Sequence, residues 1–172
     1  MKQLLLGVLS TLMVLTIASL GYLKFGFAEV RGDLPPSRIE TYLMRAAVHA
    51  SVRREAREID NPVEPTNENL IRGGKMYLNE CSGCHGEPGK EHASPDPLNP
   101  AAPHLPTLGT QYSEAQVFWV AKHGIRRTGM FANGVWNSDP DLWTVAASIK
   151  RMNTLPARVK QALEQKPSSP QT

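Results

Sequence analysis

Residues 79–89 read NECSGCHGEPG and contain both cysteines of the chain and one of its five histidines. Two thiols three residues apart can form a redox-active pair, half of a zinc site, or the attachment point of a cofactor. Positions i, i+3 and i+4 share one face of a helix. We therefore expect Cys81, Cys84 and His85 to project in the same direction, and the chemistry of this trio decides both the fold class and the function.

The spelling C-x-x-C-H is the attachment signature of c-type haem. Two sulfurs at this spacing reach the two vinyl groups of a porphyrin and form thioethers, and the adjacent imidazole lies under the iron. A thioredoxin-like pair requires a βαβ pattern, and a structural zinc site requires four ligands; the sequence shows neither. A buried disulfide would leave His85 without a role. We expect one haem c, covalently attached to Cys81 and Cys84, with His85 as an iron ligand.

The N-terminus contains 21 consecutive residues without a charge, between Lys2 and Lys24. This length is sufficient to cross a hydrocarbon core of about 30 Å. A cleaved signal peptide is the alternative, since Gly26-Phe27-Ala28 offers a small-x-small cleavage site, but such peptides carry an apolar core of only about 7–15 residues. We expect residues 1–28 to be a membrane anchor or a signal segment, and in either case the remainder is exported.

Composition excludes several classes of protein. The 172 residues carry a formal net charge of +3, and 20% are charged. A nucleic-acid-binding domain would show a pronounced basic face, so no nucleic-acid partner is expected. Two cysteines are too few for a disulfide framework.

Residues 29–65 are predicted to form a spacer helix followed by a linker. Ser37 and Glu40 form a capping box, and one helical face carries an apolar row of Ile39, Leu43, Ala46, Ala47 and Ala50. We expect a helix from about Arg38 to Glu58, ended by NPVEP (61–65). The simplest interpretation is a solvated spacer; the alternative is that this row docks on the following domain or on a partner.

Residues 66–156 have the pattern of an all-α domain. Asn67 is a predicted helix cap, Ser113 and Gln116 form a capping box closed by Gly124, and Ser138 or Asp139 precedes Pro140 in the first turn of a last helix. No alternating strand pattern occurs. About 90 residues make a small core, which a large apolar cofactor would complete. Residues 157–172 are expected to be a C-terminal tail.

From about Asn67 to Pro156 the chain resembles a class I cytochrome c of the bacterial membrane-anchored, mono-haem kind. The resemblance is carried by GGKMYLNECSGCHG (73–86), VAKHGIRRTGM (120–130) and LWTVAASIKRMNTLP (142–156). It implies N- and C-terminal helices crossed around a covalent haem, with Gly74 and Tyr77 facing Trp143 at the crossing.

The resemblance also implies the second axial ligand. In the family a thioether from a late loop binds the iron, and Met130 holds that position here, with Phe131 where a proline commonly follows. By the same resemblance the His85 ring donates its second N–H to a carbonyl of the proline-containing loop, best assigned to Pro103. The other histidines and methionines weighed as axial ligands are Met76, Met152, His49, His92, His104 and His123.

The expected function is electron transfer by Fe(II)/Fe(III) cycling between periplasmic or membrane redox proteins. Two filled axial sites leave no position for a small-molecule substrate, so an enzyme is not expected. One alternative is a cytochrome subunit of a periplasmic dehydrogenase or terminal oxidase; another is a haem enzyme or gas binder with an open iron site. The expected location is the bacterial inner membrane with the haem domain facing the periplasm, or the periplasm itself if residues 1–28 are removed.

Overall fold

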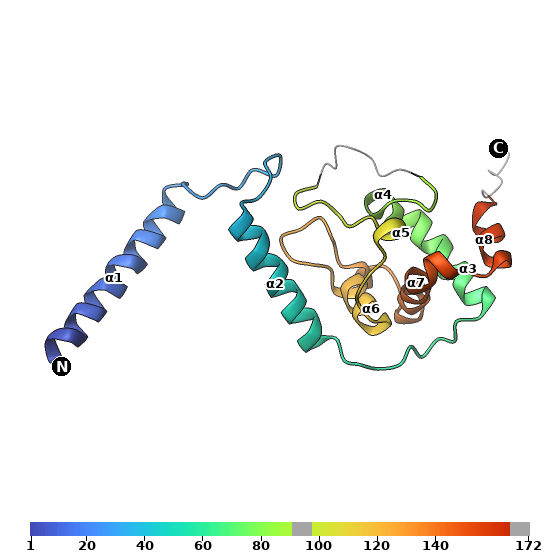
Figure 1. Cartoon of the computed structure of the whole chain (residues 1–172), viewed down its shortest axis with the longest axis horizontal. Helices are drawn as coiled ribbons and strands as arrows, with labels where there is room; N and C mark the ends of the chain where they lie inside the picture. The colour runs from blue at the N-terminus through green and yellow to red at the C-terminus, as the bar shows by residue number, and fades with distance from the viewer. Residues whose placement is uncertain (91–97, 166–172) are drawn as a thin grey trace. The chain divides into compact units, whose positions relative to one another are not determined.

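The computed structural model describes residues 1–90 and 98–165, and every regular element in these ranges is helical (Figure 1). Two compact units are present, Met1–Gly32 and Asp33–Thr172. The first contains α1 (Lys2–Lys24). The helices of the second are α2 (Arg38–Glu55), α3 (Asn67–Met76), α4 (Ser82–His85), α5 (Leu105–Leu108), α6 (Glu114–His123), α7 (Asp139–Arg151) and α8 (Ala157–Glu164), with short turns η1 (Tyr77–Cys81), η2 (Asn133–Val135) and η3 (Met152–Thr154). The all-helical class and the N-terminal apolar helix that the sequence predicts are confirmed.

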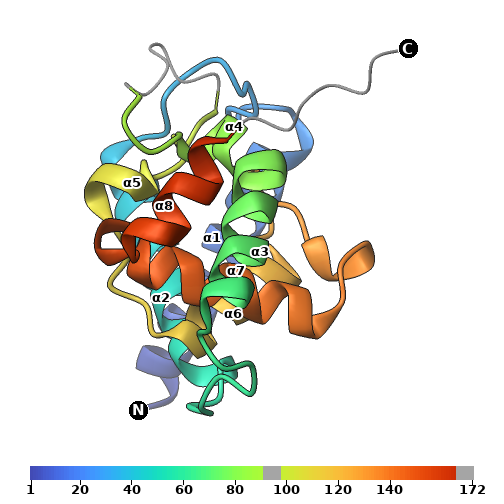
Figure 2. The same ribbon diagram turned by 90° about the vertical axis from the view of Figure 1, so that its right-hand side faces the viewer.

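The second unit is organised around the crossing of α3 and α7 (Figure 2). At the crossing Gly73 lies so close to α7 that a Cβ would sit 2.1 Å from the carbonyl oxygen of Thr144. Ser148 of α7 donates to the carbonyl oxygen of Leu70 at 2.9 Å. The resemblance placed Gly74 at this contact, but successive helical residues point about 100° apart. Gly74 instead faces Leu163 of α8.

The main core lies where α6 and η1 meet α7. Tyr77 and Trp143 are both buried in it, as the crossing of predicted helices requires. The Phe118 ring stacks on the Trp143 indole with centroids 4.1 Å apart and planes 4° from parallel. A stacked aromatic pair adds to the free energy of burial, so this pair joins α6 firmly to α7.

The last described helix, α8, closes the other side of α3. Val159 is fully buried and packs with Leu70, Ala147 and Leu155 in a second cluster. The sequence pattern predicted a tail from residue 157, because Val159 and Leu163 are the only large apolar residues of a short polar segment. Val159 and the partly buried Leu163, which packs against the same cluster, dock this helix of eight residues.

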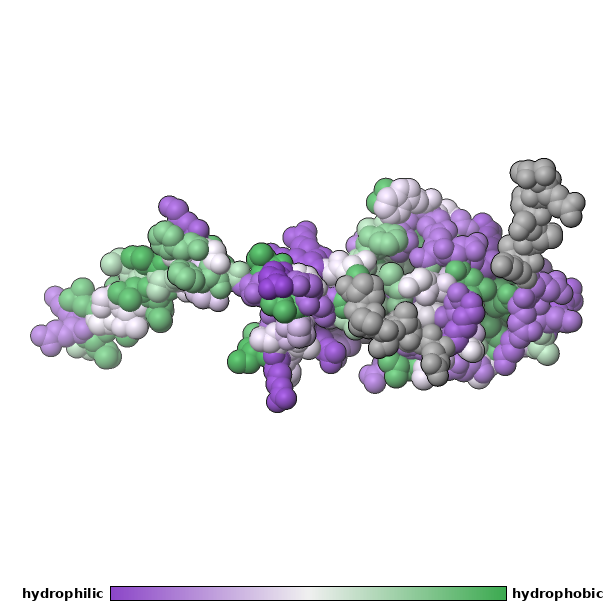
Figure 3. Space-filling model, turned by 90° about the horizontal axis from the view of Figure 1, so that it is seen from above, coloured by the Kyte–Doolittle hydropathy of each residue, from purple (hydrophilic) through white to green (hydrophobic). Residues whose placement is uncertain are grey.

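Helix α1 is an apolar rod with no buried residue, coloured mostly green in Figure 3. At about 1.5 Å per residue, 23 residues extend roughly 35 Å, which is enough for a bilayer core. Its hydroxyl groups donate to carbonyls one turn earlier; for example, Thr16 donates to Leu12 at 2.8 Å and Ser19 to Leu15 at 2.8 Å. Such internal pairing removes the cost of polar groups in lipid. Among the described residues it is the one helix long and apolar enough to span a membrane.

Helix α2 packs on α6 by a face that the sequence pattern did not single out. Val52 is 1% exposed and Ala56 5% exposed, whereas Ile39 and Leu43 of the predicted apolar row are 74% and 54% exposed. The His49 Nδ1 atom lies 2.8 Å from the Tyr112 hydroxyl. The expected solvated spacer is therefore a docked helix.

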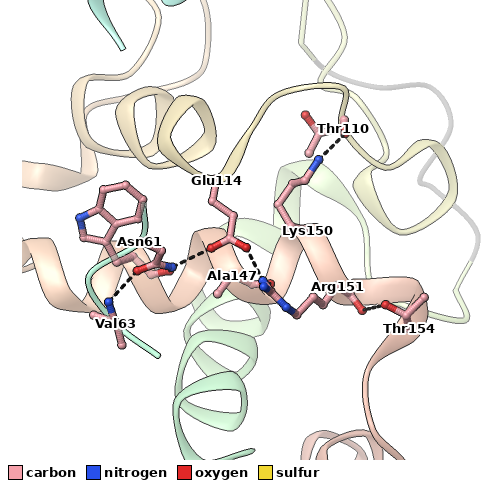
Figure 4. A network of polar contacts seen from close by, with 9 residues as sticks. Asn61, Val63, Thr110, Glu114, Ala147, Lys150, Arg151 and Thr154 are labelled. Atoms are coloured by element: carbon pink, nitrogen blue, oxygen red, sulfur yellow. Dashed lines mark hydrogen bonds and ion pairs between the residues drawn. The ribbon is translucent and has the colours of Figure 1, made fainter. Parts of the chain in front are cut away.

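The segment after α2 is also fastened to the domain (Figure 4). The Asn61 amide donates to Glu114 Oε2 at 2.8 Å and to the Trp143 carbonyl oxygen at 3.1 Å. Arg151 pairs with the same Glu114 carboxylate, and Val63 N–H donates to Asn61 Oδ1 at 2.9 Å. The stretch predicted as a linker thus joins α6 and α7 through one shared carboxylate.

Candidate functional site

The predicted attachment trio, Cys81, Cys84 and His85, lies on a locally altered helix. Residues Tyr77–Cys81 form a π-helical turn between α3 and α4, a feature often found at functional sites. Gly86 then ends α4 with φ +84°, a conformation that disfavours side chains. Cys81 is half-buried against the main core and Cys84 is exposed. Both are free thiols.

The imidazole of His85 is held in one orientation. Its Nδ1 lies 3.0 Å from the carbonyl oxygen of Pro103, which confirms the carbonyl expected from the sequence. A carbonyl oxygen only accepts, so Nδ1 carries the proton and Nε2 presents a lone pair. Partners of this kind fix the tautomer and raise the basicity of histidine ligands. His85 is therefore prepared to bind a metal through Nε2.

Tyr77 stabilises the backbone that follows Cys81, Cys84 and His85, a role that the sequence did not reveal. Its hydroxyl donates to the carbonyl oxygen of Gly86 at 2.7 Å and lies 3.2 Å from that of His85. The ring is 1% exposed. Burial, followed by the Cys81 and Glu87 charges, raises the pKa of Tyr77 far above its ordinary value. Tyr77 precedes His85 by eight residues, a little over two helical turns, and the course of the chain at Gly86 completes the contact.

The Cys81 side chain packs against the main hydrophobic core. Burial, with smaller effects of Glu80 and Cys84, raises the pKa of Cys81 from 9.0 to about 11. The neutral thiol is therefore its resting form at neutral pH in the absence of a cofactor.

Met130 lies on a tightly bonded loop after α6. Gly124 ends α6 with φ +65°, and a Cβ there would lie 2.6 Å from the Met130 carbonyl oxygen. That oxygen accepts from Ile125 N–H at 2.9 Å, and Met130 N–H donates to Thr128 Oγ1 at 3.1 Å. Thr128 in turn donates to the Ile125 carbonyl oxygen at 2.8 Å. The loop thus fixes the backbone at Met130, whose side chain is half-buried.

Two alternative histidine ligands are engaged elsewhere. His49 is bonded to Tyr112. The His104 ring lies against Gly86, where a Cβ would be 2.1 Å from its Cδ2. It directly follows Pro103, whose carbonyl binds His85, so it belongs to the His85 side of the site. His104 is thus badly placed for the opposite axial position.

The remaining candidates for the second axial ligand are His123, Met76, Met152 and His92. His123 is exposed, with its ring 5.0 Å from that of Trp119. Met76 and Met152 pack against the main core. His92 lies outside the described residues. Met130 stays a prediction as the second axial ligand, as the resemblance implies.

The residues present fit a covalently held porphyrin. Two unpaired thiols and one oriented imidazole stand within five residues, and the described chain contains no group of three or more His, Cys, Asp or Glu side chains suited to a different metal site. Large apolar side chains lie exposed on the segments that follow Pro103 and Met130, where a porphyrin would need apolar walls: Leu108, Phe131, Val135 and Trp136.

Part of the chain matches a known protein family. The model of the family described as cytochrome C oxidase, cbb3-type, subunit III matches residues 68–149. This range includes the attachment trio, the Met130 loop and most of α7. Comparisons with curated proteins and with solved structures return no match.

Proposed function

Because residues 68–149 form a class I c-type cytochrome domain, we propose that this chain carries single electrons through one haem bound covalently to Cys81 and Cys84, with His85 and Met130 as axial ligands. The observation that carries the proposal is the bond from His85 Nδ1 to the Pro103 carbonyl, which leaves Nε2 free to ligate. When bound, the haem supplies one-electron Fe(III)/Fe(II) chemistry.

The two proposed axial ligands, His85 and Met130, determine the reduction potential of the haem. The thioether of Met130 is a soft ligand that favours the reduced metal, so a His/Met pair gives a higher reduction potential than a bis-histidine pair. His85, with Nδ1–H bound to Pro103, is a basic nitrogen donor. With His85 and Met130 both bound, the iron would have no open position for a substrate. We therefore propose a carrier rather than an enzyme.

The location follows from the apolar helix and from the cofactor. Helix α1 is a candidate membrane span, and we propose that it anchors residues 66–156, the haem domain, at the bacterial inner membrane. Thioether formation follows export in the family that the chain resembles, so we propose that the haem domain faces the periplasm. Its partners are redox proteins that reach the membrane surface.

A second candidate is favoured by the family match. The matched description names a subunit of a terminal oxidase, so the chain would be a bound subunit that delivers electrons within a complex. Gentle solubilisation in detergent separates the two cases. Co-purification of a stoichiometric oxidase supports the subunit, whereas a monomeric cytochrome that reduces an added acceptor supports the carrier.

The axial assignment is tested on protein matured in a host that attaches haem c. We expect one haem per chain to remain after denaturation and solvent extraction, and the ferric protein to show the weak near-infrared absorption of an iron–sulfur bond. Met130→Ala should abolish this absorption and allow carbon monoxide to bind the ferrous form, while Met152→Ala should leave both unchanged. Persistence of the absorption in Met130→Ala would eliminate Met130, and a colourless extracted polypeptide would eliminate the covalent haem.

A further inference from the structure

The segment 98–103 contacts both parts of the chain that carry the proposed axial ligands. At its C-terminal end the carbonyl oxygen of Pro103 accepts from Nδ1 of His85 at 3.0 Å. At its N-terminal end the side chain of Leu98 lies against Gly129, the residue before the proposed thioether ligand. One short segment therefore touches the His85 side and the methionine side of the site.

The contact between Leu98 and Gly129 is close enough to depend on the absence of a side chain. A Cβ on Gly129 would lie 2.8 Å from Leu98 Cδ2, 3.1 Å from Cδ1 and 3.5 Å from Cγ, so its three nearest neighbours would all be atoms of Leu98. Gly129 is not among the glycines with positive φ, and its backbone conformation therefore does not require glycine. The close approach of Leu98 is what a side chain at this position would disturb.

The segment 98–103 has little backbone freedom. The rings of Pro100 and Pro103 fix their φ angles, and the residue before each proline, Asn99 or Ala102, is sterically restricted as well. A chain with few accessible conformations loses little entropy when it is ordered. The segment can therefore hold Leu98, which is half-buried, in a fixed place relative to the Pro103 carbonyl.

The loop that presents Met130 needs such a contact from outside. Its described hydrogen bonds join Ile125 to Met130, Met130 to Thr128 and Thr128 to Ile125. These bonds all lie within the loop, so they fix its shape and leave its position relative to the His85 side undetermined. Leu98 supplies a contact from a different segment.

We propose that Leu98 is a positioning residue for Met130. By packing on Gly129 it holds the Met130 loop against the segment that orients His85, which favours the thioether over an external ligand for the second axial position. The two axial ligands are then placed relative to each other by residues 98–103. The proposal rests on the proposed haem site with Met130 as its second axial ligand.

The test uses the full-length holoprotein with Leu98→Ala, Gly129→Ala and the double substitution. Leu43→Ala is the matched control, because it makes the same chemical change at a 54% exposed position of α2. Imidazole affinity of the ferric protein and the near-infrared absorption of the iron–sulfur bond report on Met130. Denaturant unfolding, measured in parallel, reports on stability alone.

We expect Leu98→Ala to bind imidazole several-fold more tightly than wild type and to show a weaker near-infrared absorption, with Leu43→Ala equal to wild type in both. Gly129→Ala should also bind imidazole more tightly, because its methyl group displaces the Leu98 side chain. In the double variant this methyl group fills part of the space that Leu98 vacates. Its gain in imidazole affinity should therefore be smaller than the product of the two single gains, as for residues in contact.

Imidazole affinities that are equal in Leu98→Ala and Leu43→Ala, with a loss of stability in the former alone, would make Leu98 a purely structural residue and overturn the proposal. Independent effects of the two substitutions in the double variant would also contradict it. These results would leave Met130 as the ligand. A wild type without the near-infrared absorption would instead remove the Met130 assignment, and this proposal with it.

Discussion

The hydroxyl group of Tyr77 donates to the carbonyl oxygen of Gly86 at 2.7 Å, across the whole attachment segment. Tyr77→Phe removes this donor and leaves a buried carbonyl unpaired, which should lower the free energy of unfolding of the holoprotein by about 1–2 kcal/mol. Haem attachment should survive, because the ring still fills its site. Denaturant unfolding followed by haem absorbance measures the change. Tyr42→Phe, at a 73% exposed position, is the control and should have no effect.

Tyr112 gives the docking of α2 a pH dependence. Burial at its contact with α2, opposed by the nearby Arg53 charge, raises the pKa of Tyr112 above 10.0. An unfolded tyrosine ionises near 10.0 while the folded one remains neutral, so the contribution is complete below pH 10 and is lost as pH rises further. Wild type should therefore lose stability with alkaline pH more steeply than Tyr112→Phe, by less than the limit of about 1.4 kcal/mol per pH unit for one proton. Parallel stability curves between pH 8 and 11 would contradict this assignment.

The two adjacent glycines of α3 should respond very differently to alanine. A Cβ on Gly73 meets the backbone of Thr144 at 2.1 Å, whereas one on Gly74 meets the side-chain tip of Leu163 at 2.7 Å. The first clash separates two helices and should cost at least about 3 kcal/mol or prevent holoprotein from accumulating. In the second case Leu163 can move and alanine favours the helix by up to about 1 kcal/mol, so the net change should stay within about 1 kcal/mol. Equal yields and melting temperatures for the two variants would show that the crossing is looser than the structure indicates.

The sequence predicts some of these features well, because they depend on local rules. Ser37, Ser113 and Ser138 cap α2, α6 and α7 as expected, since capping is decided within four residues. The cap of α3 is Thr66 rather than Asn67, because two adjacent residues of the same capping type leave the boundary open. The Pro103 carbonyl was found through family resemblance and not through periodicity.

Other features depend on contacts between distant segments and were not predictable from local patterns. The docked face of α2 was missed because the helix carries two apolar rows, and the longer row, at Ile39 and Leu43, is the exposed one. The role of Tyr77 depends on where the chain returns after Gly86. Glu114 bonds to Asn61 and to Arg151, which lie 53 and 37 positions away from it in the sequence. Local sequence patterns do not predict pairings over such distances.

The Asn61 amide should be essential for holding the segment after α2. Asn61→Asp replaces the amide donor by a carboxylate. This carboxylate would be repelled by the Glu114 carboxylate and by the Trp143 carbonyl oxygen, to which the amide donates in wild type. We expect a loss of about 1–3 kcal/mol in the free energy of unfolding and faster proteolysis between α2 and α3, with haem spectra unchanged. Asn79→Asp changes the same groups at an exposed position and should leave both measurements at the wild-type value. Equal proteolysis of the two variants would mean that the bonds of Asn61 do not hold the segment.

Thr128 should determine how firmly Met130 is presented, because its hydroxyl accepts from Met130 N–H at 3.1 Å and donates to the Ile125 carbonyl at 2.8 Å. Thr128→Val keeps the shape of the side chain and removes both hydrogen bonds. The loss of one typical hydrogen bond costs about 1 kcal/mol. If Met130 is the axial ligand, the free energy that favours its thioether over an added ligand falls by about the same amount. Imidazole should then bind the ferric protein about fivefold more tightly, in titrations followed by absorbance. Thr107→Val, at an exposed position of α5, should bind imidazole as wild type does. An unchanged imidazole affinity in Thr128→Val would show that the loop holds Met130 without these two bonds.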